Sequence, residues 1–199
     1  MATASAIYAG LTLHKARARF CVDNRLLPDG GEGADWWSIR FGKLAIHLPN
    51  FAWRRRALLR HDLHHIVTGY ACSPVGEMEM AAWEFSAGRF PSRLATAFCL
   101  PLVGLGALLA PKATFAAFLR GRAGATLYGE LLADELLAAD VGTLRERLAP
   151  ANPARPSVGD VAAYYALVLQ SLALIATPPL VAVLLAAVAR AALNRLGAS

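Results

Sequence analysis

Three of the five histidines in this 199-residue chain lie within five positions, at His61, His64 and His65, beside Asp62. Residues four apart share one face of an α-helix, so His61 and His65 are expected to point the same way, with Asp62 close enough to bend toward them. Two imidazoles and a carboxylate are suitable ligands for zinc, iron or manganese, and they leave positions open for another ligand and a water. The cluster therefore predicts a divalent-metal site.

Glu77 is the expected further ligand, because a second helix is predicted to begin just before it. Ser73-Pro74 is typical of a helix start, with serine as N-cap and proline in the first turn. An antiparallel helix pair would bring that turn back beside the end of the first helix. The helix dipole alone also favours a glutamate in a first turn, so a purely structural role for Glu77 stays open.

Two more side chains are candidates for a catalytic role. Glu84 follows Glu77 by seven residues, two helical turns along the same face, and could enter the cavity as an acid or base. His64 points away from the other two histidines, so we expect it to support them from behind or to pack between helices. No motif for a nucleotide or another organic cofactor occurs, and neither HExxH nor GxSxG is present.

The elements that must position these residues are mostly helices. We expect one helix over residues 51–67 with Asn50 as its N-cap, and another over residues 74–87 that Gly88 ends. Earlier, residues 37–48 alternate in polarity around Gly42-Lys43, which predicts a short β-hairpin. The fold class is therefore mainly α, with the metal site between two helices.

Composition points to a membrane. Hydrophobic residues make up 56% of the chain and charged residues only 17%, which lies outside the usual range of soluble proteins. Residues 94–110 carry no charge and are about long enough to span a bilayer, but Pro101 makes a buried, kinked or re-entrant helix an equal alternative.

The second uncharged run, residues 161–189, is longer than the roughly 20 residues that a spanning helix needs. Thr177-Pro178-Pro179 interrupts it, so either one long broken helix or two short ones would fit. We expect a helical metal-binding domain at residues 1–154, followed by an apolar, membrane-associated helical extension at residues 155–199.

Charge and cysteine content indicate the cellular location and the kind of binding partner. The net charge of +6 comes mainly from arginines, which could meet anionic lipid headgroups, whereas no helix-turn-helix or zinc-finger pattern indicates nucleic-acid binding. The three cysteines are widely spaced and odd in number, so a disulfide framework is not expected. These features favour a membrane-associated protein on the reducing, cytoplasmic side.

The spacing His61-Asp62-x-x-His65, eleven residues and then Glu77 resembles the metal motif of the coenzyme Q biosynthesis protein 4 family. The similarity covers about residues 50–150 and is supported by Arg60, Val67-Thr68-Gly69-Tyr70, Gly76 and Leu144-Arg145-Glu146-Arg147-Leu148. It implies that His61, Asp62, His65 and Glu77 bind a divalent metal in an all-helical, membrane-associated fold. Zinc is the ion usually described for the family, and Fe²⁺ and Mn²⁺ remain open.

The resemblance also implies a role in ubiquinone biosynthesis at the bacterial inner membrane. The family removes and replaces the C1 carboxyl of the prenylated aromatic precursor, by decarboxylation and hydroxylation, and helps to organise other quinone-biosynthesis enzymes. Such a lipophilic substrate needs an apolar cleft that opens onto the bilayer. The hairpin and the long apolar extension depart from ordinary members and indicate a divergent bacterial-type branch, so a related phenolic lipid stays open as substrate, as does a homo-oligomer.

Two alternatives belong to other functional classes. In the first, the protein is a non-catalytic lipid-binding scaffold whose metal only joins two helices. In the second, it is a metal-dependent hydrolase resembling the HD phosphohydrolases. That class needs a further histidine and a distant aspartate, for which only His14, His47 and Asp160 are available as weak candidates.

Overall fold

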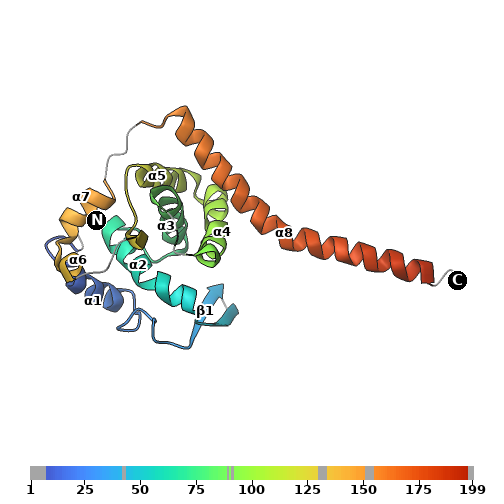
Figure 1. Ribbon diagram of the computed structural model, residues 1–199, viewed down its shortest axis with the longest axis horizontal. Helices are drawn as coiled ribbons and strands as arrows, with labels where there is room; N and C mark the ends of the chain where they lie inside the picture. Colours follow the sequence, from blue (N-terminus) through green and yellow to red (C-terminus); the bar gives the residue numbers. More distant parts are fainter. Residues whose placement is uncertain are drawn as a thin grey trace.

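The computed structural model describes residues 8–41, 44–88, 90, 92–129, 134–150 and 155–196, with side chains except at 39–41, 44, 46 and 179–196. The predicted mainly α fold is confirmed: the described residues form eight α-helices, one 3₁₀ turn and a two-stranded antiparallel hairpin (Figure 1). In order, the elements are α1 (Leu13–Asp23), β1 (Trp36–Phe41), β2 (Leu44–Pro49), α2 (Ala52–Thr68), α3 (Pro74–Ala87), α4 (Arg93–Leu109), α5 (Pro111–Arg122), η2 (Leu127–Gly129), α6 (Asp134–Ala138), α7 (Val141–Leu148) and α8 (Val158–Leu196).

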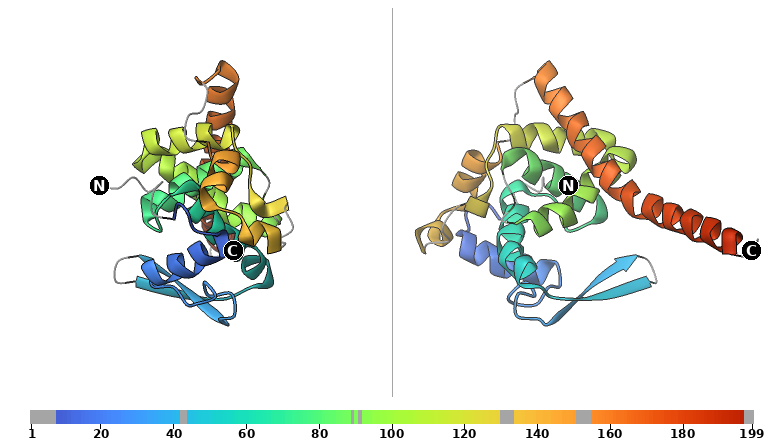
Figure 2. Two further views of the ribbon diagram at one scale, coloured as in Figure 1. Left: turned by 90° about the vertical axis from the view of Figure 1, so that its left-hand side faces the viewer. Right: turned by 45° about the vertical axis from the view of Figure 1, so that its right-hand side comes forward.

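The predicted hairpin forms, with Trp37 opposite Leu48 in its register. Its expected turn at Gly42-Lys43 lies outside the described residues. The hairpin projects from the start of α2 rather than joining a larger sheet (Figure 2). It therefore adds an appendage to a helical body.

α2 carries the histidines, and its start differs from expectation. The N-cap is Phe51, which makes no side-chain cap bond, so the prediction of Asn50 as N-cap is wrong. The Asn50 amide instead donates to the carbonyl oxygens of Gly31 (2.9 Å) and Ala34 (2.8 Å), because the preceding loop offers partly buried acceptors that need a donor. At the other end, Gly69 takes the left-handed conformation with φ of 80°, which glycine adopts without a steric penalty.

Two arginines fix the C-terminal end of α2. The guanidinium of Arg145 donates to the carbonyl oxygens of Val67 and Ile66, both at 2.9 Å, and Arg120 donates to that of Thr68 at 2.7 Å. These carbonyls have no partners within the helix, and positive charge at a helix C-terminus is favourable. The last turn of the histidine helix is thus held from α5 and α7.

α3 begins where the sequence predicts. The Ser73 hydroxyl accepts a hydrogen bond from the Gly76 N–H at 3.2 Å, and Pro74 occupies the first turn. Any side chain at Gly76 would collide with the Ala71 carbonyl, so glycine permits the close return of the chain after α2. Because Trp83 and its neighbours on α3 are buried against α5 and α4, the turn that carries Glu77 has a fixed position.

α8 runs as one helix through Thr177-Pro178-Pro179, so the single-helix interpretation of the apolar run is the observed one. Its first part docks on the body. The Ser171 hydroxyl donates to the Leu100 carbonyl (2.6 Å) and accepts from the Gly104 N–H (2.8 Å), next to the proline that interrupts the hydrogen-bond ladder of α4.

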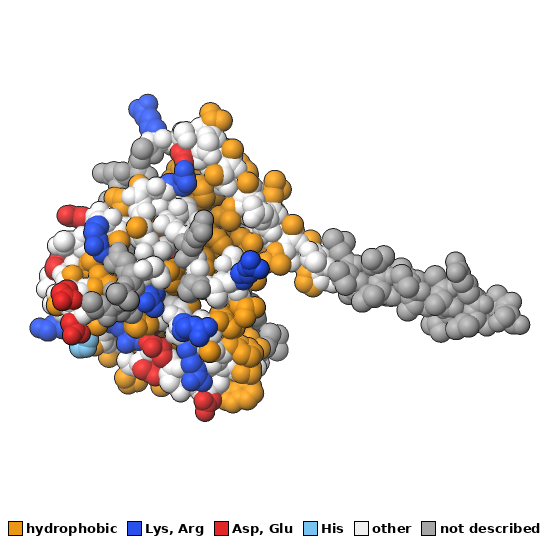
Figure 3. Space-filling model, viewed as in Figure 1, with side chains coloured by type: hydrophobic (Ala, Val, Ile, Leu, Met, Phe, Trp, Pro, Cys, Tyr) orange, Lys and Arg blue, Asp and Glu red, His pale blue; other side chains and the backbone are white. Residues whose placement is uncertain are grey.

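The remainder of α8 leaves the body as a projecting rod (Figure 1). Hydrophobic side chains are frequent on its docked part in the space-filling view (Figure 3). By length and composition, the segment Val158–Pro178 is able to cross a membrane, and α8 could therefore serve as a membrane anchor.

Candidate metal centre

His61, His65 and Glu77 form a compact group of potential ligands, as their spacing predicts. His61 and His65 lie one turn apart near the end of α2, and Glu77 lies in the first turn of α3. One ligand atom from each residue falls within 4.8 Å of the others. These three residues, called the metal group below, could therefore hold a metal ion.

The distances show how these atoms converge. Nε2 of His61 lies 3.2 Å from Nε2 of His65, and the two Glu77 oxygens lie 3.2 Å from His61 and 3.3 Å from His65. Two nitrogen ligands at zinc-bond length on a tetrahedral ion stand about 3.3 Å apart. The arrangement fits a small divalent cation.

The Nδ1 atoms of His61 and His65 both donate hydrogen bonds to other parts of the protein. Nδ1 of His65 faces the carbonyl oxygen of Tyr70 at 2.9 Å, and Nδ1 of His61 faces a carboxylate oxygen of Glu84 at 3.2 Å. Because both partners can only accept, each Nδ1 must carry a proton. The Nε2 lone pairs of the two rings then face one another, which is repulsive unless a proton or a metal ion lies between them. The two nitrogens are therefore placed to share a proton or to bind a metal ion together.

Glu84 lies behind the ligands and holds them in place. One of its oxygens accepts from His61, from Nδ1 of His64 at 2.7 Å and from the Tyr128 hydroxyl at 2.8 Å. The Leu127 N–H donates to Nε2 of His64 at 2.8 Å, which fixes the tautomer of that ring. Carboxylates that orient metal-binding histidines in this manner are typical of protein metal sites.

Glu84 is fully buried and is not among the residues that line the cavity beside the metal group. His64 is equally buried, between Glu84 and η2. The structure therefore gives both residues a supporting position. A role for Glu84 or His64 as acid or base stays a prediction, because neither side chain lines the cavity.

The surroundings favour positive charge at His61. Burial alone would lower its pKa, but the carboxylates of Glu84 and Glu77 outweigh burial and raise the pKa well above 6.5. Burial likewise opposes ionisation of the two glutamates, yet their histidine partners hold both pKa values well below 4.5. Burial lowers the pKa of His64, consistent with a neutral ring that accepts a hydrogen bond.

Asp62 is the one predicted ligand that does not join the group. Its Oδ2 has no hydrogen-bond partner in the described part of the chain, and a side chain at Gly30 would collide with it. Asp62 is 4% exposed, and burial raises its pKa to about 6. It lines the same cavity as the three ligands, so its role as a fourth ligand stays a prediction.

A cavity of about 360 Å³ opens beside the metal group. The Trp37 ring of the hairpin packs edge-on against Phe98 of α4, with centroids 5.5 Å apart, and Trp53 of α2 lies 5.6 Å from Phe98. The guanidinium of Arg54 covers Trp37 at 4.2 Å. The remaining wall is mostly apolar or aromatic and includes Leu26, Leu58, Phe90, Leu102, Cys72, Cys99 and Tyr128.

A larger hollow of about 740 Å³ lies at the C-terminal end of α2, beside Tyr70 and Arg120. Its arginines bind backbone carbonyls, and neither histidine nor cysteine lines it. We therefore place the function at the smaller cavity, where the groups that can do chemistry converge.

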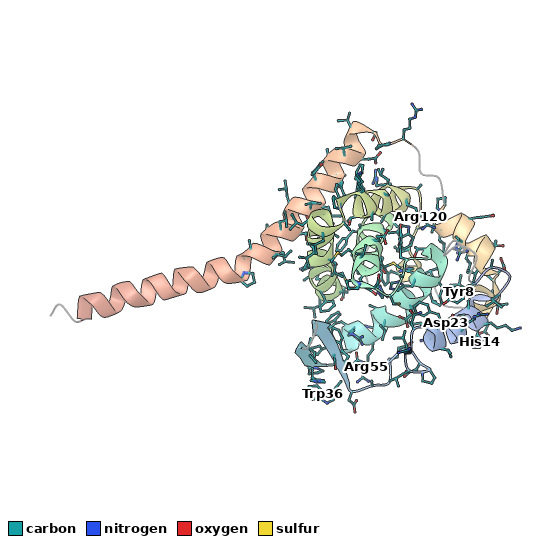
Figure 4. The ribbon with its side chains drawn as sticks, turned by 180° about the vertical axis from the view of Figure 1, so that it is seen from behind. Tyr8, His14, Asp23, Trp36, Arg55 and Arg120 are labelled. Carbon is teal, nitrogen blue, oxygen red and sulfur yellow. The ribbon has the colours of Figure 1, made fainter. Side chains whose placement is uncertain are left out.

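The residues that the hydrolase alternative needs lie elsewhere. His14 is exposed on the outer side of α1 (Figure 4), and His47 bonds to Ser38 within the hairpin at 2.9 Å. Asp160 pairs with Arg122 at the start of α8. None of the three joins the metal group, so the structure adds no support for that alternative.

Sequence reasoning missed several contributors to the site. The Tyr70 carbonyl and the Tyr128 hydroxyl orient the ligands, and Trp37 and Trp53 wall the cavity. The concentration of aromatic residues around the hairpin was the available signal for the wall. Nothing local marks a backbone carbonyl or a distant tyrosine as part of a metal centre.

Comparisons with protein-family models, curated proteins and solved structures found no match to this chain.

Proposed function

We propose that this chain is a metal-dependent, membrane-associated protein that acts on a lipophilic aromatic acid, in quinone biosynthesis. The observation that carries the proposal is the position of His61, His65 and Glu77 at a cavity whose other walls are largely apolar and aromatic. A polar headgroup would meet the cation there, and its ring would pack against Trp37 and Phe98.

The size of the cavity supports an amphiphile rather than a small polar metabolite. A volume of about 360 Å³ accommodates an aromatic headgroup with the first part of a chain, but not a long prenyl tail. Such a tail must continue outside the protein, and the apolar helix α8 gives the chain a means of staying at a bilayer.

The reaction we propose is at C1 of the ring. In decarboxylation, the bond from C1 to the carboxylate breaks and CO₂ leaves, while the electron pair of that bond stays on C1. A proton from water then bonds to C1 in place of the carboxyl group and leaves hydroxide. Replacement by hydroxyl needs dioxygen and an external two-electron reductant in addition, with water as the second product.

A bound divalent ion would supply positive charge to the carboxylate or phenol oxygens of the substrate. The protein's own part is to bind and orient: His61, His65 and Glu77 hold the cation, Glu84 fixes the His61 ring, and the aromatic wall excludes water. The resemblance of the HDxxH and glutamate spacing to the coenzyme Q biosynthesis protein 4 family supports this substrate class and zinc as the ion.

The test combines metal content with turnover. Full-length wild type, Glu77→Ala and the matched surface control His14→Ala are expressed in a quinone-deficient bacterial strain, and quinone and carboxylated precursor are measured by mass spectrometry. We expect wild type and His14→Ala to restore quinone, and Glu77→Ala to accumulate precursor. Quinone production by a metal-free Glu77→Ala protein would overturn the proposal.

A second experiment, with purified protein, addresses a scaffold with a structural metal. That alternative is favoured by one observation, namely that the three ligands come from two different helices, which an ion would join. A scaffold would bind metal and other pathway enzymes, and the purified protein in vesicles would leave a carboxylated prenyl-phenol unchanged.

A further inference from the structure

One face of α4 is exposed and entirely apolar. We name it the α4 stripe: Leu94, Phe98, Leu105, Leu108 and Leu109, with exposed fractions of 61%, 41%, 36%, 65% and 70%. These positions recur at helical spacing, so they share one side of the helix. The opposite side of α4, with Ala95, Val103, Gly104 and Gly106, is buried in the body.

A soluble helix of this kind would show charged or polar residues on its outer face. No charged residue occurs between Arg93, at the start of α4, and Lys112, just after its end. Both of these cations are exposed, and neither forms an ion pair in the part of the chain that the structure describes. An apolar stripe with a cation at each end is typical of a helix that lies in the surface of an anionic membrane.

Exposed aromatic residues extend the stripe at the end near the hairpin. Phe98 contacts Trp37 and Trp53. Trp36, which precedes Trp37 in the chain, is 62% exposed, and Phe51, which stacks on Trp53, is 50% exposed. Trp36 lies at the outer edge of the hairpin (Figure 4). Tryptophan is enriched at the level of lipid headgroups, where its ring is partly in water and partly in hydrocarbon.

The stripe also connects the cavity with the anchor. Phe98 lines the cavity beside the metal group. At its other half, α4 holds α8 through Ser171, and the rest of α8 leaves the body on the side where α4 lies (Figure 1). A bilayer on that side would touch the stripe and the mouth of the cavity together.

We propose that the α4 stripe lies in the surface of an anionic lipid bilayer and that the metal cavity opens through it toward the acyl chains. The proposal deepens the proposed function, on which it rests for the lipophilic substrate. A second copy of the chain is a poorer occupant: antiparallel pairing of two α4 helices would place Arg93 against Lys112, and parallel pairing would place like residues together, so both are repulsive.

The test places a tryptophan reporter on the stripe of the full-length protein. Leu108→Trp and Leu94→Trp are compared with Val22→Trp, a control on α1 at a position that is 76% exposed. Each is bound to phosphatidylcholine–phosphatidylglycerol vesicles whose acyl chains carry bromine, which quenches tryptophan on contact. The emission of wild type is subtracted to isolate the added residue.

We expect the added emission at Leu108 and Leu94 to be quenched at least about twofold more than at Val22, and less in vesicles of phosphatidylcholine alone. Quenching equal to the control overturns the proposal, and so does a blue-shifted, unquenched signal, which would indicate a protein partner or a second copy. Two reporters are used so that a folding defect in one leaves the other informative. If the added tryptophans are quenched but the protein does not turn over the precursor, only the proposed function is contradicted. If the protein is active but the tryptophans are not quenched, only this inference is contradicted.

Discussion

Two partly buried polar clusters meet α2, and they differ in how their hydrogen bonds are arranged. At the C-terminal end, the guanidinium groups of Arg120 and Arg145 donate to backbone carbonyls of α2 and of the segment after α7. One turn earlier, Nε2 of His61 and Nε2 of His65 face each other at 3.2 Å while their outer nitrogens donate elsewhere. In the first cluster, guanidinium donors lie against carbonyl acceptors. In the second cluster, two ring nitrogens that can each accept a hydrogen bond lie against each other.

The comparison separates stability from function. A cluster in which donors match acceptors holds the fold without any added group, and its loss costs stability. A cluster of converging lone pairs is complete only when a proton or a metal ion lies between them, and its geometry is maintained by other parts of the protein. The arginine cluster is therefore expected to govern folding, and the histidine cluster to govern metal binding.

The largest effect is expected at Arg145, which is 9% exposed. Arg145→Ala leaves the carbonyls of Val67 and Ile66 without their donor, and we expect it to lower the free energy of unfolding by about 2–4 kcal/mol. Urea denaturation measures the change, with the exposed Arg19→Ala as control, for which we expect less than about 1 kcal/mol. If Arg145→Ala and wild type became equally stable once both were saturated with metal, the distinction between the clusters would be erased.

Metal should stabilise the protein only through the second cluster. With free ion at 100 times its Kd, we expect the free energy of unfolding to rise by about 2.7 kcal/mol in wild type and in His14→Ala, and by nothing measurable in Glu77→Gln. Thermal or urea unfolding with zinc and with a chelator provides the measurement. An unchanged response in Glu77→Gln would contradict the ligand group.

The same assay decides the role of Asp62. Asp62→Asn keeps the shape of the side chain while it removes the charge. A variant that responds to metal as wild type does would leave a three-residue site, and a variant as unresponsive as Glu77→Gln would establish Asp62 as the fourth ligand.

A smaller effect is expected at the support of His61. Glu84→Gln should weaken metal binding about 10- to 100-fold, because the ring loses the carboxylate that fixes its tautomer and orientation. Tyr128→Phe removes one hydrogen bond to the same oxygen, so we expect a weakening of about tenfold or less. Competition with a chromophoric zinc chelator measures both affinities. Equal affinity in Glu84→Gln and wild type would show that Glu84 does not position the ligand.

The smallest effect is expected at Asp160, a partly exposed residue at the start of α8. The N–H and hydroxyl of Ser157 and the charge of Arg122 lower its pKa below 3.8. A carboxyl whose pKa falls on folding contributes stability above its unfolded pKa and loses it as pH decreases. Asp160→Asn should therefore be slightly less stable than wild type at neutral pH, and the difference should vanish once the pH falls below the lowered pKa of the folded carboxyl. If the stability difference persisted in acid, its cause would be the changed shape of the side chain and not its charge.

Local sequence rules were enough for much of this site. Ser73-Pro74 and Gly88 bound α3 at the observed residues, since capping depends on neighbours in the chain. The four-residue spacing of His61 and His65 placed both rings on one face because helical geometry is fixed. Glu77 followed from the turn between the helices.

Other features depend on contacts between distant segments. Asn50 is a good N-cap by type, yet a loop some twenty residues earlier takes its amide. Ser171 gives no local sign that it will bond to the backbone of α4. Asp62 has the right spacing for a ligand, but the loop at Gly30 lies against it. In each case tertiary packing decides what the side chain meets.

The central claim is that His61, His65 and Glu77 bind a divalent ion, and elemental analysis tests it most directly. Full-length wild type and His65→Ala are purified without chelator, equilibrated with zinc, passed through a desalting column and measured by mass spectrometry for metal per chain. The account predicts one tightly bound ion per wild-type chain and none in His65→Ala. A wild type that retains no ion, or a variant that retains as much as wild type, would contradict it.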